Sequence, residues 1–311
     1  MKGVIQHRFG GPEVLEFAEL PRPRRFLTEL LLKVHAASVN PVETAVRSGD
    51  FPLLGEPPFV LGWDVSGVVE EIEAGSTRFQ VGDEVFGMPL FPRAAGGYAE
   101  YAAGPTRQFW RKPARLSHVQ AAALPLVGLT ALQALGDLAQ LQPGQRVLIH
   151  AAGGGVGHVA VQIAKALGAH VIGTASAGKH AFVRGLGADE LIDYQAVDYT
   201  QAVRDVDVVF DLLGNGHAQR SLAVLKPGGI LVSALPRSSG DMPALAAAAG
   251  KRFAVVAVEP DGAGLQRLAE WVDAGQLTPH VSHELPLREA AQAHELVAQG
   301  NTLGKIVLKV A

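Results

Sequence analysis

The sequence predicts an α/β protein in which a mostly-β segment is followed by a doubly wound parallel sheet. Up to about residue 120, runs rich in Val, Ile and Leu are separated by Gly and Pro, as is typical of short strands. From about residue 121, apolar runs alternate with helical patterns, which indicates βαβ units and a parallel sheet. One unit, "IHAAGGGVGHVAVQIAKALGA" (149–169), joins a strand to an amphipathic helix through a glycine-rich turn.

Composition narrows the class of protein. The 311 residues suit about two domains, and 48% apolar with 18% charged residues provides material for real cores. A net charge of −3 without a basic block makes nucleic acid an unexpected partner. The absence of cysteine excludes disulfides and cysteine-ligated metals. The N-terminus has no apolar leader, and the most apolar stretch, 121–135, is too short for a membrane span, so a cytoplasmic protein is expected.

The predicted elements follow from periodicity. In the first segment, "ELLLKVHAASV" (29–39) and "DVSGVVEEIEA" (64–74) are strands. Helices are predicted for "GLQRLAEWVDAGQL" (264–277) and "LPLREAAQAHELVAQG" (285–300), and "LGKIVLKVA" (303–311) is a closing strand. The strands predicted for the parallel sheet are Val147–Ala151, His170–Thr174, Glu190–Ile192, Val206–Asp211, Gly229–Ala234 and Phe253–Val258.

The glycine-rich turn predicts a dinucleotide site. Backbone N–H groups and the positive end of the helix dipole favour an anion there, and Gly154 and Gly155 let a pyrophosphate approach closely. Gly157 permits tight packing of helix on strand, while Ala152 replaces the first glycine of G-x-G-x-x-G, which requires a negative φ. A plain turn is the alternative, but the strand, helix and second strand provide the required context.

The end of the second strand favours NADP(H). NAD-dependent enzymes usually carry an acid there for the ribose 2′-hydroxyl. Positions 173–180 have none and offer Thr174, Ser176 and Lys179, which suit a 2′-phosphate. The alternative is an ordinary polar loop with an exposed lysine.

The chain as a whole resembles the medium-chain dehydrogenase/reductase superfamily, in its zinc-free quinone oxidoreductase branch. The resemblance rests on "AASVNPVETAVRSGDFP" (36–52), "PFVLGWDVSGVV" (58–69), "VGDEVFG" (81–87), "GGYAEY" (96–101), "LPLVGLTALQAL" (124–135), the glycine turn, "GADELIDY" (187–194), "DVVFDLLG" (207–214), "LKPGGILVS" (225–233) and "LGKIVL" (303–308). It implies a GroES-like catalytic domain interrupted by a Rossmann domain, with NADPH and substrate in the cleft between them. The expected division is 1–121 and 260–311 for the catalytic domain and 122–259 for the Rossmann domain.

The resemblance also implies that no metal is bound. Zinc-dependent relatives have a cysteine where this chain has Asn40, and Gly-His-Glu where it has Gly62-Trp63-Asp64. The cysteine-rich structural-zinc lobe is absent. His280 and His283, an i, i+3 pair beside Pro279, are interpreted as structural.

Without a metal to polarise a carbonyl, the acceptor must already be activated by conjugation. The expected reaction is hydride delivery from NADPH to a quinone or an α,β-unsaturated carbonyl, a small-molecule substrate, with the protein positioning the reactants. A trans-acting enoyl-thioester reductase and a non-catalytic NADPH-binding or redox-sensing protein are the alternatives, and a zinc alcohol dehydrogenase is a further one.

Residue roles follow from the resemblance. Asn40 is expected near the nicotinamide ribose and the substrate, although it also suits a helix cap before Pro41. Thr130 is expected near the nicotinamide, although it also suits a buried position in a helix. Asn40, Phe51 and Trp63 are expected to line the substrate pocket. The remaining expected cofactor contacts are the pyrophosphate turn Gly154, Gly155 and Val156, the 2′-phosphate group Thr174, Ser176, Lys179 and Tyr194, the adenosine-side Gly214, and Ala234 and Leu235 by the nicotinamide.

The chain departs from its relatives where many have tyrosines. Those positions are Ala45 and Phe51, so aromatic stacking and a phenolic proton donor are missing there. Tyr98 is interpreted as mostly structural, Lys305 as a strand lysine without an assigned role, and no catalytic general acid is identified. By analogy a homodimer is expected, with the sixth strand (Phe253–Val258) pairing across a two-fold axis.

Overall fold

The computed structural model describes residues 1–214 and 216–310, which form two compact units. Unit 1 comprises Met1–Leu126, Glu259–Gly275 and Pro279–Ala311, and unit 2 comprises Val127–Val258 and Gln276–Thr278. Within the described residues, no helix combines the length and apolar character needed to cross a membrane.

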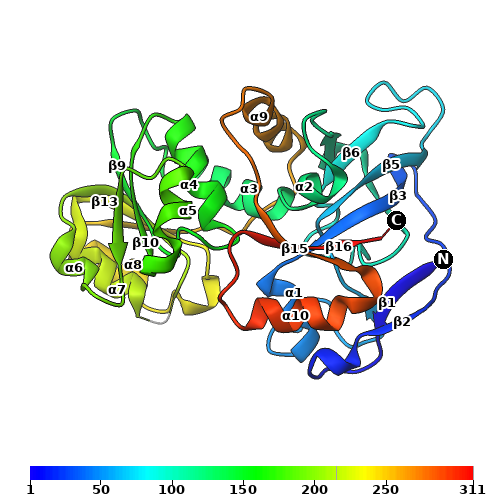
Figure 1. The fold of residues 1–311 in the computed structure, drawn as a ribbon, viewed down its shortest axis with the longest axis horizontal. Helices are drawn as coiled ribbons and strands as arrows, with labels where there is room; N and C mark the ends of the chain where they lie inside the picture. The colour runs from blue at the N-terminus through cyan, green and yellow to red at the C-terminus, as the bar shows by residue number, and fades with distance from the viewer. Residues whose placement is uncertain (215, 311) are drawn as a thin grey trace. The chain divides into compact units, whose positions relative to one another are not determined.

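Unit 1 is built on β-sheets. Its long central strand β3 (Glu29–Val39) pairs antiparallel with three neighbours, β5, β7 and β16 (Figure 1). The three leucines of "ELLLKVHAASV" are at most 1% exposed, so this strand is core on both faces. The other strands of this sheet are β5 (Val65–Glu71), β6 (Glu84–Gly87), β7 (Tyr101–Pro105), β8 (Phe109–Arg111), β15 (Val281–Pro286) and β16 (Lys305–Lys309). A smaller sheet has the order β2 (Glu16–Glu19), β1 (Lys2–Gln6), β4 (Phe59–Val60).

Helices of unit 1 begin where the sequence offers caps. Asn40 precedes α1 (Pro41–Ser48), with Pro41 at the first helical position, and Gly49 ends it in the left-handed region at φ 88°. The Asp261 side chain accepts from the N–H groups of Ala263 and Gly264 at the start of α9. The remaining α-helices placed wholly in this unit are α2 (His118–Ala122), α9 (Gly262–Asp273) and α10 (Ala290–Ala298).

Unit 2 is a parallel sheet with the strand order β11-β10-β9-β12-β13-β14, or 3-2-1-4-5-6 along the chain of this unit. This is the Rossmann order, so the predicted fold class is confirmed. The strands are β9 (Arg146–Ile149), β10 (His170–Ala175), β11 (Glu190–Asp193), β12 (Val206–Asp211), β13 (Leu225–Ser233) and β14 (Arg252–Val255).

Helices cover both faces of this parallel sheet. In Figure 1, α4 (Gly157–Ala166) lies on one side of the strands and α6 (Tyr199–Ala202) and α7 (His217–Ser221) on the other. Core residues of α6 and α7 pack with Leu148, Val209 and Leu231 of the strands. The other helices are α3 (Pro125–Leu132), which begins just before the unit boundary, the π-helical turn η3 (Gln133–Leu138), α5 (His180–Gly185) and α8 (Met242–Ala248).

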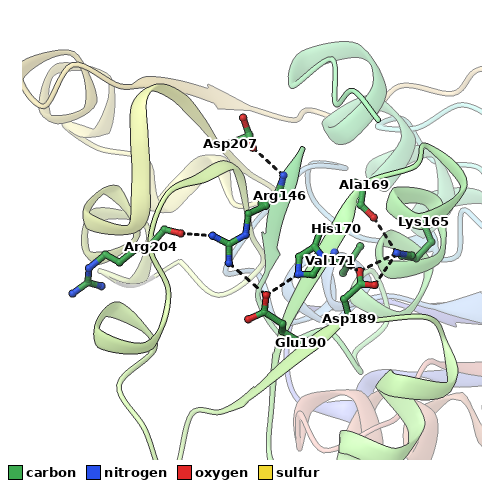
Figure 2. Close-up of polar contacts among 9 residues, drawn as sticks. All are labelled: Arg146, Lys165, Ala169, His170, Val171, Asp189, Glu190, Arg204 and Asp207. Atoms are coloured by element: carbon green, nitrogen blue, oxygen red, sulfur yellow. Dashed lines mark hydrogen bonds and ion pairs between the residues drawn. The ribbon is translucent and has the colours of Figure 1, made fainter. Parts of the chain in front are cut away.

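Ion pairs link the beginnings of the parallel strands. Figure 2 shows Glu190 accepting from Arg146 at 3.4 Å and lying 2.7 Å from His170 Nε2. The Asp207 carboxylate accepts from the Arg146 N–H at 2.9 Å, and Asp189 pairs with Lys165 at 2.9 Å. These contacts lie at the amino end of the sheet, which leaves its carboxyl end for the glycine turn and the loops that follow the strands.

The structure corrects several predicted boundaries. The strand expected to reach Ala151 ends at Ile149, because Ala151 adopts φ 48°, outside the β region. The strand expected from Gly229 begins at Leu225, and the one expected to reach Val258 ends at Val255. Of the helix predicted for 285–300, Leu285 and Pro286 belong to β15.

The division into units also differs in detail from the expected one. The first boundary lies at 126/127 instead of 121/122, and the second at 258/259 instead of 259/260. Gln276–Thr278, expected in the catalytic domain, belongs to unit 2. The reason is local: the Gln162 side chain of α4 donates to the Thr278 carbonyl at 3.1 Å and accepts from its N–H at 2.9 Å.

Candidate functional site

The glycine turn between β9 and α4 is constrained by backbone contacts. A Cβ on Gly157 would lie 2.2 Å from the Ala151 carbonyl oxygen, so this position has no room for a side chain. A Cβ on Gly154 would lie 3.2 Å from the same oxygen. The φ of Ala152 is not positive, which is the condition for replacing a glycine at this position. Ala151 adopts the left-handed conformation instead. The strain of the turn therefore falls one residue earlier than the motif suggests.

The tip of the turn suits an anion. Gly154, Gly155 and Val156 are half-buried, while Gly157 and His158 behind them are buried. The Gly154 N–H donates to the Ala151 carbonyl at 2.8 Å and the His158 N–H to the Gly154 carbonyl at 3.0 Å. The N–H groups between them, at Gly155, Val156 and Gly157 where α4 begins, are therefore the donors that the turn can offer to an anion. The tip is thus accessible, free of bulky side chains at its glycines, and supplied with donors. These residues fit the pyrophosphate of a dinucleotide.

Three of the four residues expected at the 2′-phosphate lie at one edge of unit 2. Ser176 and Tyr194 follow the paired residues Ala175 and Asp193 of β10 and β11, so they are neighbours at the carboxyl end of the sheet. Lys179 closes a turn onto Ser176, its N–H donating to the Ser176 carbonyl at 2.9 Å. Tyr194 is 57% exposed. The structure therefore brings Ser176, Lys179 and Tyr194 to this edge.

Thr174 differs from these residues. It is buried, its hydroxyl accepts from the Ala151 N–H at 3.3 Å, and the same oxygen lies 3.2 Å from Nδ1 of His150. Because the hydroxyl faces the interior with both hydrogen-bonding roles filled, we assign Thr174 to the turn and not to the phosphate.

Asp211, which the sequence did not single out, organises the loops after β12 and β13. Its carboxylate accepts from the N–H groups of Leu213 and Gly214 at 3.1 and 3.2 Å, and from the Ser233 hydroxyl at 3.0 Å. The Ala234 N–H donates to the Asp211 carbonyl at 3.0 Å. One buried acid thus holds Gly214 and Ala234, two expected cofactor contacts, beside each other, with the half-buried Leu235 next along the chain. Thr130, a further expected contact, is a buried residue of α3.

A buried polar cluster surrounds Asn40 in unit 1. The Asn40 amide nitrogen donates to Asp64 at 2.9 Å and to Glu43 at 3.3 Å, and its oxygen accepts from the Lys305 ammonium. Lys305 also donates to the Val39 carbonyl at 2.9 Å. The four side chains are at most 3% exposed. Asn40 is therefore both the helix cap of α1 and the centre of a charged network.

The charges of this cluster nearly balance. Burial raises the pKa of the Glu43 carboxyl to about 8, and the Asp64 charge acts in the same direction. Burial also raises the pKa of Asp64 and lowers that of Lys305, although attraction between Lys305 and the two acids opposes both changes. Asp64 is further satisfied by the Ser38 hydroxyl at 2.6 Å and the Leu126 N–H at 2.7 Å. An added dication would find an amide oxygen and carboxylates already bonded to donors.

The aromatic residues near this cluster are mostly committed to structure. The Trp63 indole is 1% exposed, donates to the Arg93 carbonyl at 2.7 Å, and packs edge-on against Phe91. Burial raises the pKa of the Tyr98 phenol, whose oxygen lies 3.2 Å from His294 Nε2. Phe51 is half-buried and its N–H donates to the Ala45 carbonyl at 3.0 Å, so the two positions where relatives carry tyrosines are adjacent.

Metal-ligating side chains do not gather in the part of the chain that the structure covers. Across residues 1–214 and 216–310, no three His, Asp or Glu side chains are arranged to hold a metal ion. The His283 ring contacts Ser282 at 3.0 Å instead.

Comparison with known proteins agrees with this geometry. Residues 27–114 match the alcohol dehydrogenase GroES-like domain, and residues 186–308 match the family described as zinc-binding dehydrogenase. Quinone oxidoreductase from Rattus norvegicus is 32% identical over 99% of this chain and 97% of its own length. The chain belongs to the quinone oxidoreductase branch of the medium-chain dehydrogenase/reductase superfamily. As such a quinone oxidoreductase-like protein, it is a nicotinamide-dependent oxidoreductase.

Other relatives of this quinone oxidoreductase-like protein cover its whole length. The 2-haloacrylate reductase of a Burkholderia species is 35% identical over 99% of this chain and 98% of its own. The structure of the Coxiella burnetii quinone oxidoreductase has a TM-score of 0.94 at 38% identity, covering 100% and 99% of the two chains. The Escherichia coli quinone oxidoreductase complexed with NADPH has a TM-score of 0.85 at 27% identity over 100% of both chains.

Several residues of the quinone oxidoreductase-like site were not identified from the sequence. Glu43 could have been found, because N-x-x-E before a helix is a capping signal. Lys305 and His150 carry no such local signal. Their hydrogen-bond partners are distant in the sequence, and the contacts depend on the directions in which the side chains point.

Proposed function

We propose that the protein is an NADPH-dependent, zinc-independent reductase of quinones or of the conjugated C=C bond of enones and alkenals. The observation that carries the proposal is an accessible glycine turn together with Ser176, Lys179 and Tyr194 at one edge of the sheet, where residues 173–180 at the end of β10 include no acid. A hydroxyl, an ammonium and a phenol supply donors to a 2′-phosphate, whereas an NAD site would offer a carboxylate after β10. Asp193, the acid at this edge, is the last residue of β11 and caps the next turn by accepting from the Gln195 N–H at 3.0 Å.

The chain's residues have mainly positioning roles in this proposal. Gly154, Gly155 and Val156 bind the pyrophosphate, Ser176, Lys179 and Tyr194 bind the 2′-phosphate, and Gly214, Ala234 and Leu235 contact the adenosine and nicotinamide portions. Thr130 contacts the nicotinamide. When bound, the cofactor supplies a hydride to the β-carbon of the acceptor. The resulting enolate takes its proton from water, because Tyr98 is buried, has a raised pKa and bonds to His294.

Asn40 contributes an acceptor and not a donor. Both hydrogens of its amide are bonded to Glu43 and Asp64, so a nicotinamide ribose or substrate hydroxyl would donate to its oxygen. It therefore cannot polarise a substrate carbonyl, which fits an acceptor already activated by conjugation. Phe51 and Ala45 give the proposed substrate pocket an apolar character. The Trp63 indole adds to this apolar lining.

Zinc independence is supported by the donor set. The zinc-ligand positions carry Asn40 and Trp63, no cysteine is present, and the Lys305 ammonium already bonds to the Asn40 oxygen. We expect metal analysis of the purified protein to find less than stoichiometric zinc and EDTA dialysis to leave activity unchanged. Stoichiometric zinc, lost together with activity, would refute this part of the proposal.

The decisive experiment is an NADPH-oxidation screen with 1,2-naphthoquinone, an alkenal, a cyclic enone and an enoyl thioester. The relative named 2-haloacrylate reductase acts, by its name, on a conjugated C=C bond, which supports inclusion of the enone class. Turnover of the quinone or an enone supports the proposal. Turnover of the thioester alone would replace it with an enoyl-thioester reductase, and tight NADPH binding without turnover would replace it with a binding or sensing role.

We also propose a cytoplasmic homodimer. β14 is at the edge of the sheet of unit 2, with Phe253, Ala254 and Val255 half-buried, and such an edge can pair across a two-fold axis. Light scattering after size exclusion tests it, with a monomer at micromolar concentration as the contrary result.

A further inference from the structure

His150 lies directly behind the glycine turn, between two loops that contact the cofactor in the proposed function. It follows β9 and precedes Ala151, and its backbone N–H donates to the Phe210 carbonyl of β12 at 3.1 Å. Its ring is 1% exposed and packs edge-on against Tyr199 at 4.8 Å between centroids. Both ring nitrogens contact protein hydroxyls, so the role of the ring passes through its neighbours.

Both ring nitrogens have partners. Nδ1 lies 3.2 Å from the Thr174 hydroxyl, and Nε2 lies 2.9 Å from the Ser221 hydroxyl. Thr174 in turn accepts from the Ala151 N–H at 3.3 Å, and Ser221 donates to the His217 carbonyl at 2.8 Å. The chain of contacts thus runs from the first residue of the glycine turn to the first residue of α7.

The available donors and acceptors determine which atom donates in each hydrogen bond of this series. With the Ser221 hydrogen on the His217 carbonyl, Ser221 accepts from His150 Nε2–H. His150 Nδ1 is then an acceptor and takes the hydrogen of Thr174, whose oxygen holds the Ala151 N–H. One neutral tautomer satisfies every group, and burial supports it by lowering the pKa of His150 to about 4.

This series of hydrogen bonds ends at Ala151 and at His217, the two places where the backbone must be held. Ala151 is kept at φ 48°, which costs a non-glycine residue free energy unless its surroundings enforce it. His217 begins α7, three residues after Gly214, which contacts the cofactor in the proposed function. We propose that His150 is a positioning residue for the dinucleotide: through Thr174 it holds Ala151 and the pyrophosphate turn, and through Ser221 it ties that turn to the start of α7. This inference rests on the proposed function.

The test compares NADPH dissociation constants, from quenching of protein fluorescence, for the wild type, His150→Phe, Thr174→Val and the double variant. Phe keeps the ring and Val keeps the shape, while each removes the polar contacts. Each single variant is expected to weaken NADPH binding about tenfold, the size of one lost hydrogen bond. The double variant is expected to lose about tenfold and not a hundredfold, because the two residues act in series. Ser221→Ala, a smaller change, provides a second probe of the chain if His150→Phe folds poorly.

Tyr199→Phe is the matched control. Its hydroxyl contacts Ser221 at 3.1 Å and donates to the His217 carbonyl at 3.3 Å, but it does not contact Thr174 or the Ala151 N–H that hold the glycine turn. The NADPH dissociation constant of this variant is therefore expected to stay within about twofold of the wild type. Hydrogen exchange in the cofactor-free protein is a second readout, with the Ala151 amide exchanging faster in His150→Phe and Thr174→Val but not in Tyr199→Phe.

The outcomes separate the two proposals. If the wild type binds NADPH and the folded His150→Phe and Thr174→Val variants bind it equally well, the positioning role is overturned while the proposed function stands. Additive losses in the double variant would also overturn it, since they would mean that the two residues act independently. If the wild type itself fails to bind NADPH, the proposed function and this inference fall together.

Discussion

The Asn40 amide nitrogen lies 2.9 Å from an Asp64 carboxylate oxygen, and both side chains are closed off from solvent. The contact joins the residue before α1 to the residue before β5. It is stable only because Lys305 reaches the same amide from β16 and offsets the buried carboxylate charge. The position of Asn40, and of any hydroxyl that would donate to it, therefore depends on a lysine 265 residues away.

Replacement of Lys305 by Met should be strongly destabilising. It leaves Asp64 and Glu43 without a buried counter-charge, which typically costs about 3–5 kcal/mol. Denaturant unfolding measures the loss. Lys309→Met is the matched control, because this lysine is on the same strand but exposed, with a 3.8 Å ion pair, and should cost less than about 1 kcal/mol. Adding Asp64→Asn to Lys305→Met should recover part of the loss; no recovery would argue against charge as the cause.

Alanine at Gly157 should damage the glycine turn. The new Cβ would lie 2.2 Å from the Ala151 oxygen, so the turn must shift, at a cost of about 1–3 kcal/mol, and NADPH binding should weaken with it. Thermal unfolding and a binding titration check both effects. Gly185→Ala is the control: it is an exposed helical glycine with nothing within 4 Å of the new Cβ, and it should stabilise by about 0.5–1 kcal/mol. Equal effects at the two glycines would contradict the steric argument.

Alanine at Lys179 should alter the choice of dinucleotide. Loss of the Lys179 ammonium, in the turn that Lys179 closes onto Ser176, is expected to weaken NADPH binding roughly tenfold and to leave NADH binding within about twofold. Titrations with both cofactors provide the measurement. Lys226→Ala, which removes an exposed lysine paired with Asp207 at the opposite end of the sheet, should change neither. Equal losses for NADPH and NADH in Lys179→Ala would rule out a 2′-phosphate role.

Stability should fall as pH decreases through the range set by His150. Its pKa is lowered from 6.5 to about 4 in the folded protein, so between these values the unfolded chain binds the extra proton. Stability from this group is therefore complete above about pH 6.5 and is lost as pH falls toward 4, by about 2 kcal/mol between pH 7 and pH 5. Denaturant unfolding at both pH values should show a loss smaller by that amount in His150→Phe. His294, whose pKa is lowered to about 3, acts in the same direction but is present in both proteins.

Local sequence patterns were sufficient to predict those elements whose structure depends on neighbouring residues. The strand, glycine turn and helix from Val147 onward were predicted because apolar period and glycine content act within one or two turns of chain. The same holds for Ser176 and Lys179, which one short turn brings together. The direction of the Thr174 hydroxyl was not predictable, because a strand end does not reveal which way its side chain points, and contacts with His150 and Ala151 hold it inward.

By itself the sequence determined the class of the protein: a parallel sheet, a dinucleotide turn, no cysteine and a motif set specific to one family. Those features depend on composition and on the short-range spacing of residues, so they can be recognised without knowledge of any tertiary contact. Only the tertiary structure decided that Lys305 serves Asn40 and that His150 supports Ala151. The register of β16 against β3, with Ile306 opposite Val39, places Lys305 beside Asn40. The pairing of β10 with β9 places Thr174 where it contacts both His150 and the Ala151 N–H. Such partners are chosen by long-range packing, which local periodicity does not encode.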